Sequence, residues 1–171
     1  MSSRPQFADL IDQHLAEQLL VTTGKLLAAG RRVATAESCT GGLLAKLLTD
    51  QPGSSQWFEC GWITYSNTAK MRELGVLAAT LEQHGAVSEA TVREMALGAL
   101  QRSGADVAIV ISGVAGPDGG TARNPVGRVW FARAVRGAPV PVVARQQNFN
   151  GNRDTIRRQA ALLALRWLAD A

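Results

Sequence analysis

The hydrophobic and polar positions of the chain predict helices that alternate with short apolar strands. Helical spacing of apolar residues covers Phe7–Ala29, and Gly30 is typical of a helix end. Apolar runs at Arg32–Ala36, Trp57–Thr64 and Val107–Ile111 are each followed by small, polar or glycine residues, which predicts strands that end in loops. The inward face of the first helix is expected to be broad: Leu10, Ile11, Leu15, Leu19, Leu20, Leu26 and Leu27.

The remaining elements follow from caps and turn residues. Helices are predicted over 43–50 and, after a cap at Ser66 or Asn67, over 68–74; one helical turn is predicted over 80–84. A longer helix is expected to begin after a cap at Ser88, and a last helix is expected to run from a cap at Asn152 to about Ala169. Two β-rich runs, 127–135 and 140–149, are joined by only four residues. That link is too short for a crossover helix, so the two runs predict an antiparallel hairpin.

Together these elements predict an α/β fold with a mixed sheet of about five strands. The earlier strands alternate with helices and should be mostly parallel, and the C-terminal hairpin should be antiparallel. The chain has 171 residues, which fits a single domain over 1–171 with a proper core.

Composition narrows the class of protein. The net charge is +4, but the basic residues are scattered and most aromatic residues lie in apolar runs, so no nucleic-acid partner is predicted. No apolar run approaches the ~20 residues of a membrane span, and Met1–Gln6 contains no apolar segment typical of a secretory signal. The two cysteines form no disulfide framework. The expected location is the cytoplasm, without membrane contact.

The turn after the first strand is the main candidate for chemistry. Glu37–Gly42 joins a buried strand to a helix, and N–H groups at a helix start lack partners within the helix. The N–H groups of Thr40, Gly41 and Gly42 could therefore stabilise an oxyanion, with Ser38 as the nucleophile. The alternative is that Ser38 or Thr40 only caps the helix.

A serine nucleophile needs a base, and elimination leaves few choices. His14 and His84 are not attached to strand-end loops, so a Ser-His-Asp triad is not predicted, and the two histidines and two cysteines lack zinc-ligand spacing. Lys70 follows a strand end, and Tyr65 lies five residues earlier in the same turn. A Ser-Tyr-Lys group could pass the serine proton through the phenol or use the amine directly. The alternative is a surface lysine and an interface tyrosine.

A glycine-rich loop, Ser112–Thr121, follows the most apolar strand of the chain. Loops at that position commonly hold ligands in α/β folds. It matches neither a Walker loop nor the dinucleotide fingerprint, because the glycine spacing differs and no helix pattern follows. The interpretation favoured here is a loop that faces the substrate, against a simple turn between strands.

Four blocks of residues resemble the CinA C-terminal domain family, the nicotinamide mononucleotide deamidases. They are Ala36–Gly42, Tyr65–Asn67 with Lys70, Gly85–Ser88, and Ser112–Pro117 through Pro125–Gly127; a weaker fifth block contains Gly151, Arg153 and Arg157. The resemblance implies a three-layer α/β/α fold of the stand-alone form and a homodimer. It also implies hydrolysis of the carboxamide of nicotinamide mononucleotide to nicotinic acid mononucleotide and ammonia. No metal or organic cofactor is expected.

Carried onto this chain, the resemblance makes Ser38 the nucleophile and Tyr65 and Lys70 its activating partners. Thr40, Gly41 and Gly42 would form the oxyanion site, and Asn67, Ser112, Gly113 and Gly116 would face the substrate. Arg153, and more weakly Arg157, would bind the 5′-phosphate, because arginine offers paired N–H donors. The chain departs from the usual family pattern at Ser112, where threonine is common, and at Asn152, where an acidic residue is common.

Three alternatives stay open at this point. The domain could be a non-catalytic nucleotide sensor, or an amidase or esterase for another small substrate. Cys39, beside Ser38, is an alternative nucleophile, ranked lower because no histidine is available to activate it.

Overall fold

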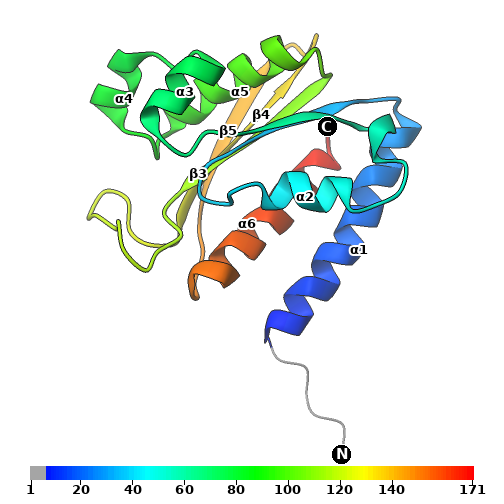
Figure 1. Cartoon of the computed structure of the whole chain (residues 1–171), viewed down its shortest axis with the longest axis horizontal. Helices are drawn as coiled ribbons and strands as arrows, with labels where there is room; N and C mark the ends of the chain where they lie inside the picture. Colours follow the sequence, from blue (N-terminus) through cyan, green and yellow to red (C-terminus); the bar gives the residue numbers. More distant parts are fainter. Residues whose placement is uncertain (1–6) are drawn as a thin grey trace, which may run out of the picture.

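A computed structural model describes residues 7–171, and the side chains from residue 11 onward (Figure 1). Met1–Gln6, on which the expectation of no secretory signal depends, lies outside this range. A single five-stranded sheet has the strand order β2-β1-β3-β4-β5. The strands are β1 Val33–Glu37, β2 Phe58–Ile63, β3 Val107–Gly113, β4 Arg128–Val135 and β5 Val142–Asn148.

The strand directions confirm the predicted mixed sheet. β1 is parallel to both β2 and β3, whereas β4 is antiparallel to β3 and to β5. Glu37 at the end of β1 is in register with Ile63 of β2 and with Ile111 of β3. The carboxyl ends of these three strands therefore lie side by side at one edge of the sheet.

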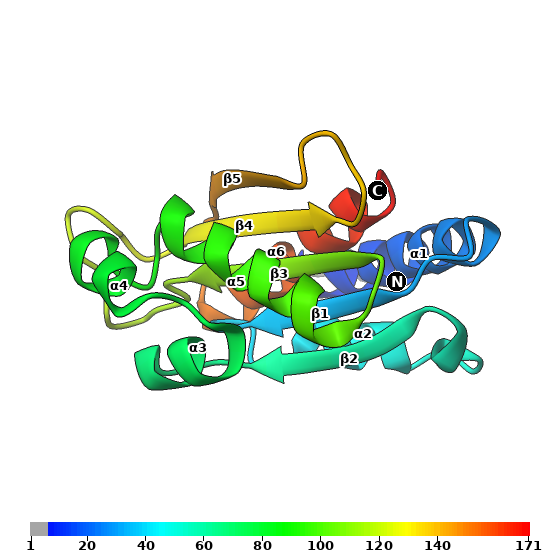
Figure 2. The ribbon, with the colours of Figure 1, turned by 90° about the horizontal axis from the view of Figure 1, so that it is seen from above.

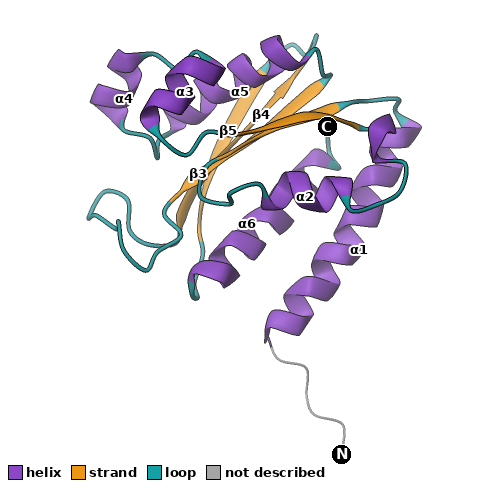
Figure 3. Ribbon diagram, viewed as in Figure 1, coloured by secondary structure: helices purple, strands orange, loops and turns teal. Residues whose placement is uncertain are grey.

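Helices cover both faces of the sheet, which confirms the three layers (Figures 2 and 3). One face carries α1 Phe7–Ala28, α2 Leu43–Thr49 and α6 Arg153–Leu168; the other carries α3 Asn67–Leu74, α4 Ala78–His84 and α5 Glu89–Ser103. A short 3₁₀ turn spans Ser54–Gln56. Alternate residues of β3 face opposite layers, because Ile109 packs in the first core and Val110 in the second. Burial on both faces explains why this strand is apolar throughout.

The predicted caps are confirmed, but the predicted face of α1 was too broad. Ser66, Ser88 and Asn152 each accept a hydrogen bond from the N–H three residues later. In α1 the buried stripe runs through Ile11, Leu15, Leu19, Thr22 and Leu26. Thr22 belongs to it because its hydroxyl donates to the Leu165 carbonyl of α6, at 2.9 Å. Leu20 and Leu27 lie beside this stripe and are 64% and 42% exposed. Within residues 7–171, no helix is both long and apolar enough to cross a membrane.

Close packing of α3 on α5 fixes the position of Lys70. At Gly98 of α5, a Cβ atom would lie 1.8 Å from the carbonyl oxygen of Leu74 at the end of α3. Only glycine allows this approach. The side chain of Lys70, one turn earlier on α3, is consequently held against the sheet edge.

This packing predicts opposite effects of two glycine-to-alanine substitutions. Gly98→Ala should lower the free energy of unfolding by about 1–3 kcal/mol, because the added methyl group meets backbone that cannot move cheaply. The control is Gly24→Ala in α1, where nothing lies within 4 Å of the added Cβ. That substitution should raise stability by up to about 1 kcal/mol, since alanine favours a helix over glycine. Urea unfolding followed by circular dichroism measures both; equal behaviour of the two variants would contradict the packing argument.

Candidate active site

The candidate site lies where three parallel strands end. Ser38 follows β1, Tyr65 follows β2, and Ser112 and Gly113 end β3. A cavity of about 260 Å³ lies at this edge. Among its lining residues are seven that the sequence predicted for the site: Ser38, Tyr65, Lys70, Ser112, Gly113, Gly116 and Arg153.

Lys70 is the direct partner of Ser38. Its Nζ lies 3.2 Å from Ser38 Oγ and donates a second hydrogen bond to the Thr64 carbonyl, at 2.6 Å. The side chain is fully buried. Burial lowers the pKa of Lys70 to about 8, because desolvation disfavours the charged amine. The alternative of a surface lysine is therefore wrong. Most of the amine is still protonated at neutral pH, but a larger fraction is neutral and able to accept a proton than in a free lysine, whose pKa is 10.5.

Cys39 is a poor competitor for the nucleophile role. Its thiol is buried, and burial raises its pKa to about 11. A thiol with that pKa carries almost no thiolate at neutral pH, and the thiolate is the reactive form. The adjacent hydroxyl, bonded to a partly neutral amine, is the better-activated group.

The carboxylate of Glu37 fixes the Ser38 turn through hydrogen bonds to the start of α2. This side chain is completely buried at the end of β1. Its Oε2 accepts from the N–H groups of Gly42 and Leu44, each at 3.1 Å, and its Oε1 accepts from Ala45 at 2.9 Å. A carboxylate is well suited to this place, because the start of a helix carries partial positive charge. Glu37 thus accepts the hydrogen bonds of the N–H groups that have no partner within the first turn of α2.

This arrangement rules out the alternative of a side-chain cap and corrects one prediction about the turn. Neither Ser38 nor Thr40 caps α2 with its side chain; the N-cap residue is Gly42, with no side-chain cap bond. Gly41 and Gly42 do not offer free oxyanion donors, because the N–H of Gly41 bonds to the Ser38 carbonyl, at 3.0 Å, and that of Gly42 bonds to Glu37. Thr40 N–H has no acceptor among residues 7–171.

Arg157 and Asn67 do not line the cavity as predicted. The guanidinium of Arg157 turns to the Thr40 carbonyl, with Nη2 at 2.6 Å and Nε at 3.2 Å, and so fixes the turn from the α6 side. Asn67 begins α3 and lines a separate depression beside α4. The contact of Arg157 was not predictable from sequence spacing, because its acceptor lies 117 positions away along the chain.

Arg153 and Tyr65 form the mouth of the cavity. The Arg153 guanidinium donates from Nη1 to the Gly116 carbonyl, at 2.8 Å, and from Nη2 to the Tyr65 hydroxyl, at 3.0 Å. Tyr65 is 60% exposed, and its recorded partner is this arginine rather than Ser38 or Lys70. Ser112 is buried, and its hydroxyl donates to the Ala86 carbonyl, at 2.8 Å. Ser112 therefore joins the end of β3 to the segment that precedes α5.

Comparisons with known proteins agree with the expected resemblance. The profile of the CinA C-terminal domain matches residues 14–171. The nicotinamide-nucleotide amidohydrolase PncC of Escherichia coli K12 is 55% identical over 152 residues, covering 88% of this chain and 91% of that protein. PncC of Enterobacter agglomerans is 53% identical over 154 residues, covering 90% and 93%.

Solved structures give the same result for the fold. A CinA-superfamily protein from Klebsiella pneumoniae 700603 superposes with a TM-score of 0.87 at 42% identity, covering 91% of this chain and 96% of that chain. The competence/damage inducible protein CihA from Agrobacterium tumefaciens has a TM-score of 0.87 at 39% identity, covering 98% and 97%.

The buried cap predicts a large loss of stability when the Glu37 carboxylate is removed. Glu37→Ala should lower the free energy of unfolding by about 3–5 kcal/mol, because three N–H groups lose a charged acceptor in a buried site. Glu37→Gln, which keeps one acceptor oxygen, should cost less. Chemical denaturation measures both, with Glu82→Gln on the exposed side of α4 as the control. A loss no larger than that of the control would refute the capping role.

Proposed function

Because the chain belongs to the CinA C-terminal domain family, we propose that it hydrolyses the carboxamide of nicotinamide mononucleotide to nicotinic acid mononucleotide and ammonia. The PncC relatives are named as nicotinamide-nucleotide amidohydrolases. The observation that carries the proposal for this chain is the buried contact between Lys70 Nζ and Ser38 Oγ, at 3.2 Å. The proposed role is the recycling of pyridine nucleotide.

Lys70 acts as the general base in this mechanism. A desolvated lysine whose pKa is about 8 is neutral in a useful fraction of molecules near pH 7. The neutral amine takes the proton of Ser38 Oγ as the oxygen attacks the carboxamide carbon. The hydrogen bond from Nζ to the Thr64 carbonyl supports this role, because it orients the amine toward the serine.

Attack gives a tetrahedral intermediate whose oxyanion needs donors. Among the described residues of the turn, the N–H groups of Cys39 and Thr40 have no acceptor, whereas Glu37 and the Ser38 carbonyl occupy those of Gly42 and Gly41. Cys39 also lines the cavity. One such donor is typically worth about 3 kcal/mol of the barrier. Glu37 and Arg157 are positioning residues here, since they hold the turn from two sides without lining the cavity.

Collapse of the intermediate breaks the C–N bond. The protonated Lys70 gives its proton to the leaving nitrogen, which departs as ammonia, and the acyl group remains on Ser38 Oγ. Lys70, neutral again, then takes a proton from water, whose oxygen attacks the ester carbon and releases the carboxylate product. The serine oxygen regains its proton from Lys70.

Arg153 is proposed to bind the 5′-phosphate at the mouth of the cavity. Its guanidinium is held by the Gly116 carbonyl and the Tyr65 hydroxyl, which present it toward the lined space. Arginine binds phosphate through paired, charge-assisted hydrogen bonds. In this proposal Tyr65 acts by positioning Arg153, and the proton of Ser38 passes directly to Lys70.

Substitution of either member of the Ser-Lys pair should stop turnover. Ser38→Ala and Lys70→Met are each expected to reduce kcat for ammonia release from nicotinamide mononucleotide by at least about a thousandfold. The matched controls are Ser55→Ala and Lys46→Met, which change exposed residues outside the cavity. Full activity of Ser38→Ala would remove this serine from the mechanism, and a mere rise in KM for Lys70→Met would leave Lys70 only a binding role.

Cleavage of free nicotinamide or its riboside at the same rate would argue against phosphate binding by Arg153.

The pH dependence of the reaction should report the titration of Lys70. Below its pKa the amine is protonated and cannot accept the serine proton. We therefore expect kcat/KM to rise about tenfold per pH unit and to become constant above about pH 8. Initial rates of ammonia release between pH 6 and pH 9.5 measure this profile, and Lys46→Met should give the same curve. A rate that falls as the pH rises toward 8 would rule out the neutral amine as the base.

A further inference from the structure

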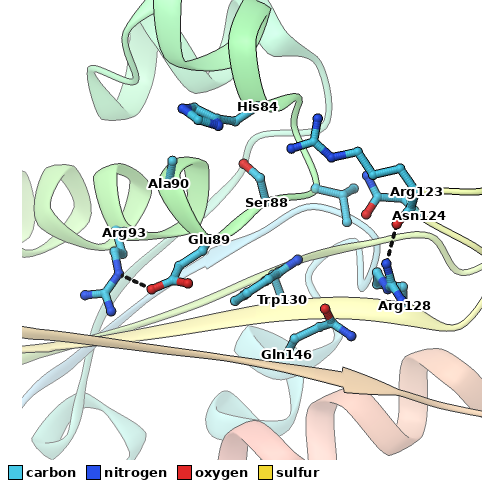
Figure 4. Close-up of a pocket in the computed structure, with 11 residues that line it drawn as sticks. His84, Ser88, Glu89, Ala90, Arg93, Arg123, Asn124, Arg128, Trp130 and Gln146 are labelled. Atoms are coloured by element: carbon cyan, nitrogen blue, oxygen red, sulfur yellow. Dashed lines mark hydrogen bonds and ion pairs between the residues drawn. The ribbon is translucent and has the colours of Figure 1, made fainter.

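A second and larger cavity, of about 490 Å³, is shown in Figure 4. Its walls come from His84 at the end of α4, from the first turns of α5 and the residues just before it, from β4 and β5, and from residues 123–124 of the long loop after β3. Val87 lines both cavities, and the same loop contributes residues 114–119 to the Ser38 cavity. The volume falls in the range of about 300–1,000 Å³ typical of small-molecule sites.

The charge of this second cavity is one-sided. Arg93, Arg123 and Arg128 line it against a single carboxylate, that of Glu89, which gives three positive charges to one negative. Glu89 is already paired with Arg93 Nε, at 2.8 Å. The guanidinium of Arg123 is exposed and has no hydrogen-bond or ion-pair partner among the described residues. Arg128 already donates to the Arg123 carbonyl and to the Asn148 side chain, and Arg93 donates to the Val142 carbonyl. Arg123 therefore carries most of the spare N–H donors that the lining offers to an anion.

Apolar groups occupy the space between the charges. In Figure 4, Arg93 lies at one end and Arg123 and Arg128 lie at the other, with the indole of Trp130 between them. Val87 and Ala90 add apolar surface. An indole can stack on a flat aromatic ring, and arginine side chains can donate paired hydrogen bonds to phosphate oxygens. A ligand that carries both groups matches this distribution better than a simple inorganic anion does.

We propose that this second cavity binds a phosphorylated aromatic compound of the nucleotide class, at a site separate from Ser38. The ring would lie against Trp130, and the phosphate would bind Arg123 and Arg128. A ligand bound there contacts the loop that also walls the Ser38 cavity. The proposal does not depend on the reaction proposed above, because it concerns binding alone.

Isothermal titration of the full chain with adenosine 5′-monophosphate as the probe tests this site. We expect saturable binding, with weaker binding of adenosine and of inorganic phosphate, each of which offers half of the recognised chemistry. Arg123→Gln should weaken binding by at least about tenfold, since a charged hydrogen bond is lost. The Arg123 side chain has no partner among the described residues, so its substitution should leave the melting temperature unchanged.

Two control variants locate the probe. Arg153→Gln, in the Ser38 cavity, and Arg166→Gln, exposed on α6 and outside both cavities, should bind the probe within twofold of the unmodified chain. No binding to the unmodified chain would overturn the proposal. Loss of binding in Arg153→Gln would also overturn it, because the probe would then occupy the Ser38 cavity.

Discussion

The buried carboxylate of Glu37 is the interaction on which the geometry of the site depends. It ends β1 and bonds to three N–H groups at the start of α2, so strand, turn and helix form one rigid unit. Arg157 holds the Thr40 carbonyl of the same turn from α6. Ser38 is consequently fixed relative to both the sheet and one helical layer. The Glu37 carboxylate already compensates the partial positive charge at the start of α2. The N–H groups nearest Ser38 are therefore the ones left for a substrate.

The opposite layer supplies the second half of the site. Lys70 reaches Ser38 from α3, and α3 can lie close to α5 because Gly98 has no side chain. The serine and its partner are therefore held by helices on different faces of the sheet, and they meet only at the edge where the parallel strands end. Their alignment depends on the packing of all three layers, and not on a local sequence motif.

Much of this arrangement could be predicted from the sequence, for identifiable reasons. Short apolar runs and side-chain caps such as Ser88 report local preferences, so the elements and the mixed sheet were predictable. Lys70 was found by elimination, because few groups can act as a base in a chain with two histidines. Side-chain direction was not predictable in the same way. Glu37 turns toward α2 and Arg157 turns toward Thr40 because of the hydrogen bonds they make in the folded chain, and sequence spacing does not predict these orientations. Asn67 lines a separate depression beside α4.

The burial of Lys70 has an energetic consequence for the whole molecule. A lysine whose pKa is about 8 when folded and 10.5 as a free group binds fewer protons in the native state between these pH values, so native stability increases with pH across that window. Near neutrality the difference corresponds to a cost of roughly 3 kcal/mol. Selection for heat resistance would favour an uncharged side chain at this position, whereas selection for turnover would retain the amine. Position 70 is thus where stability and the catalytic role proposed for Lys70 make opposing demands on one residue.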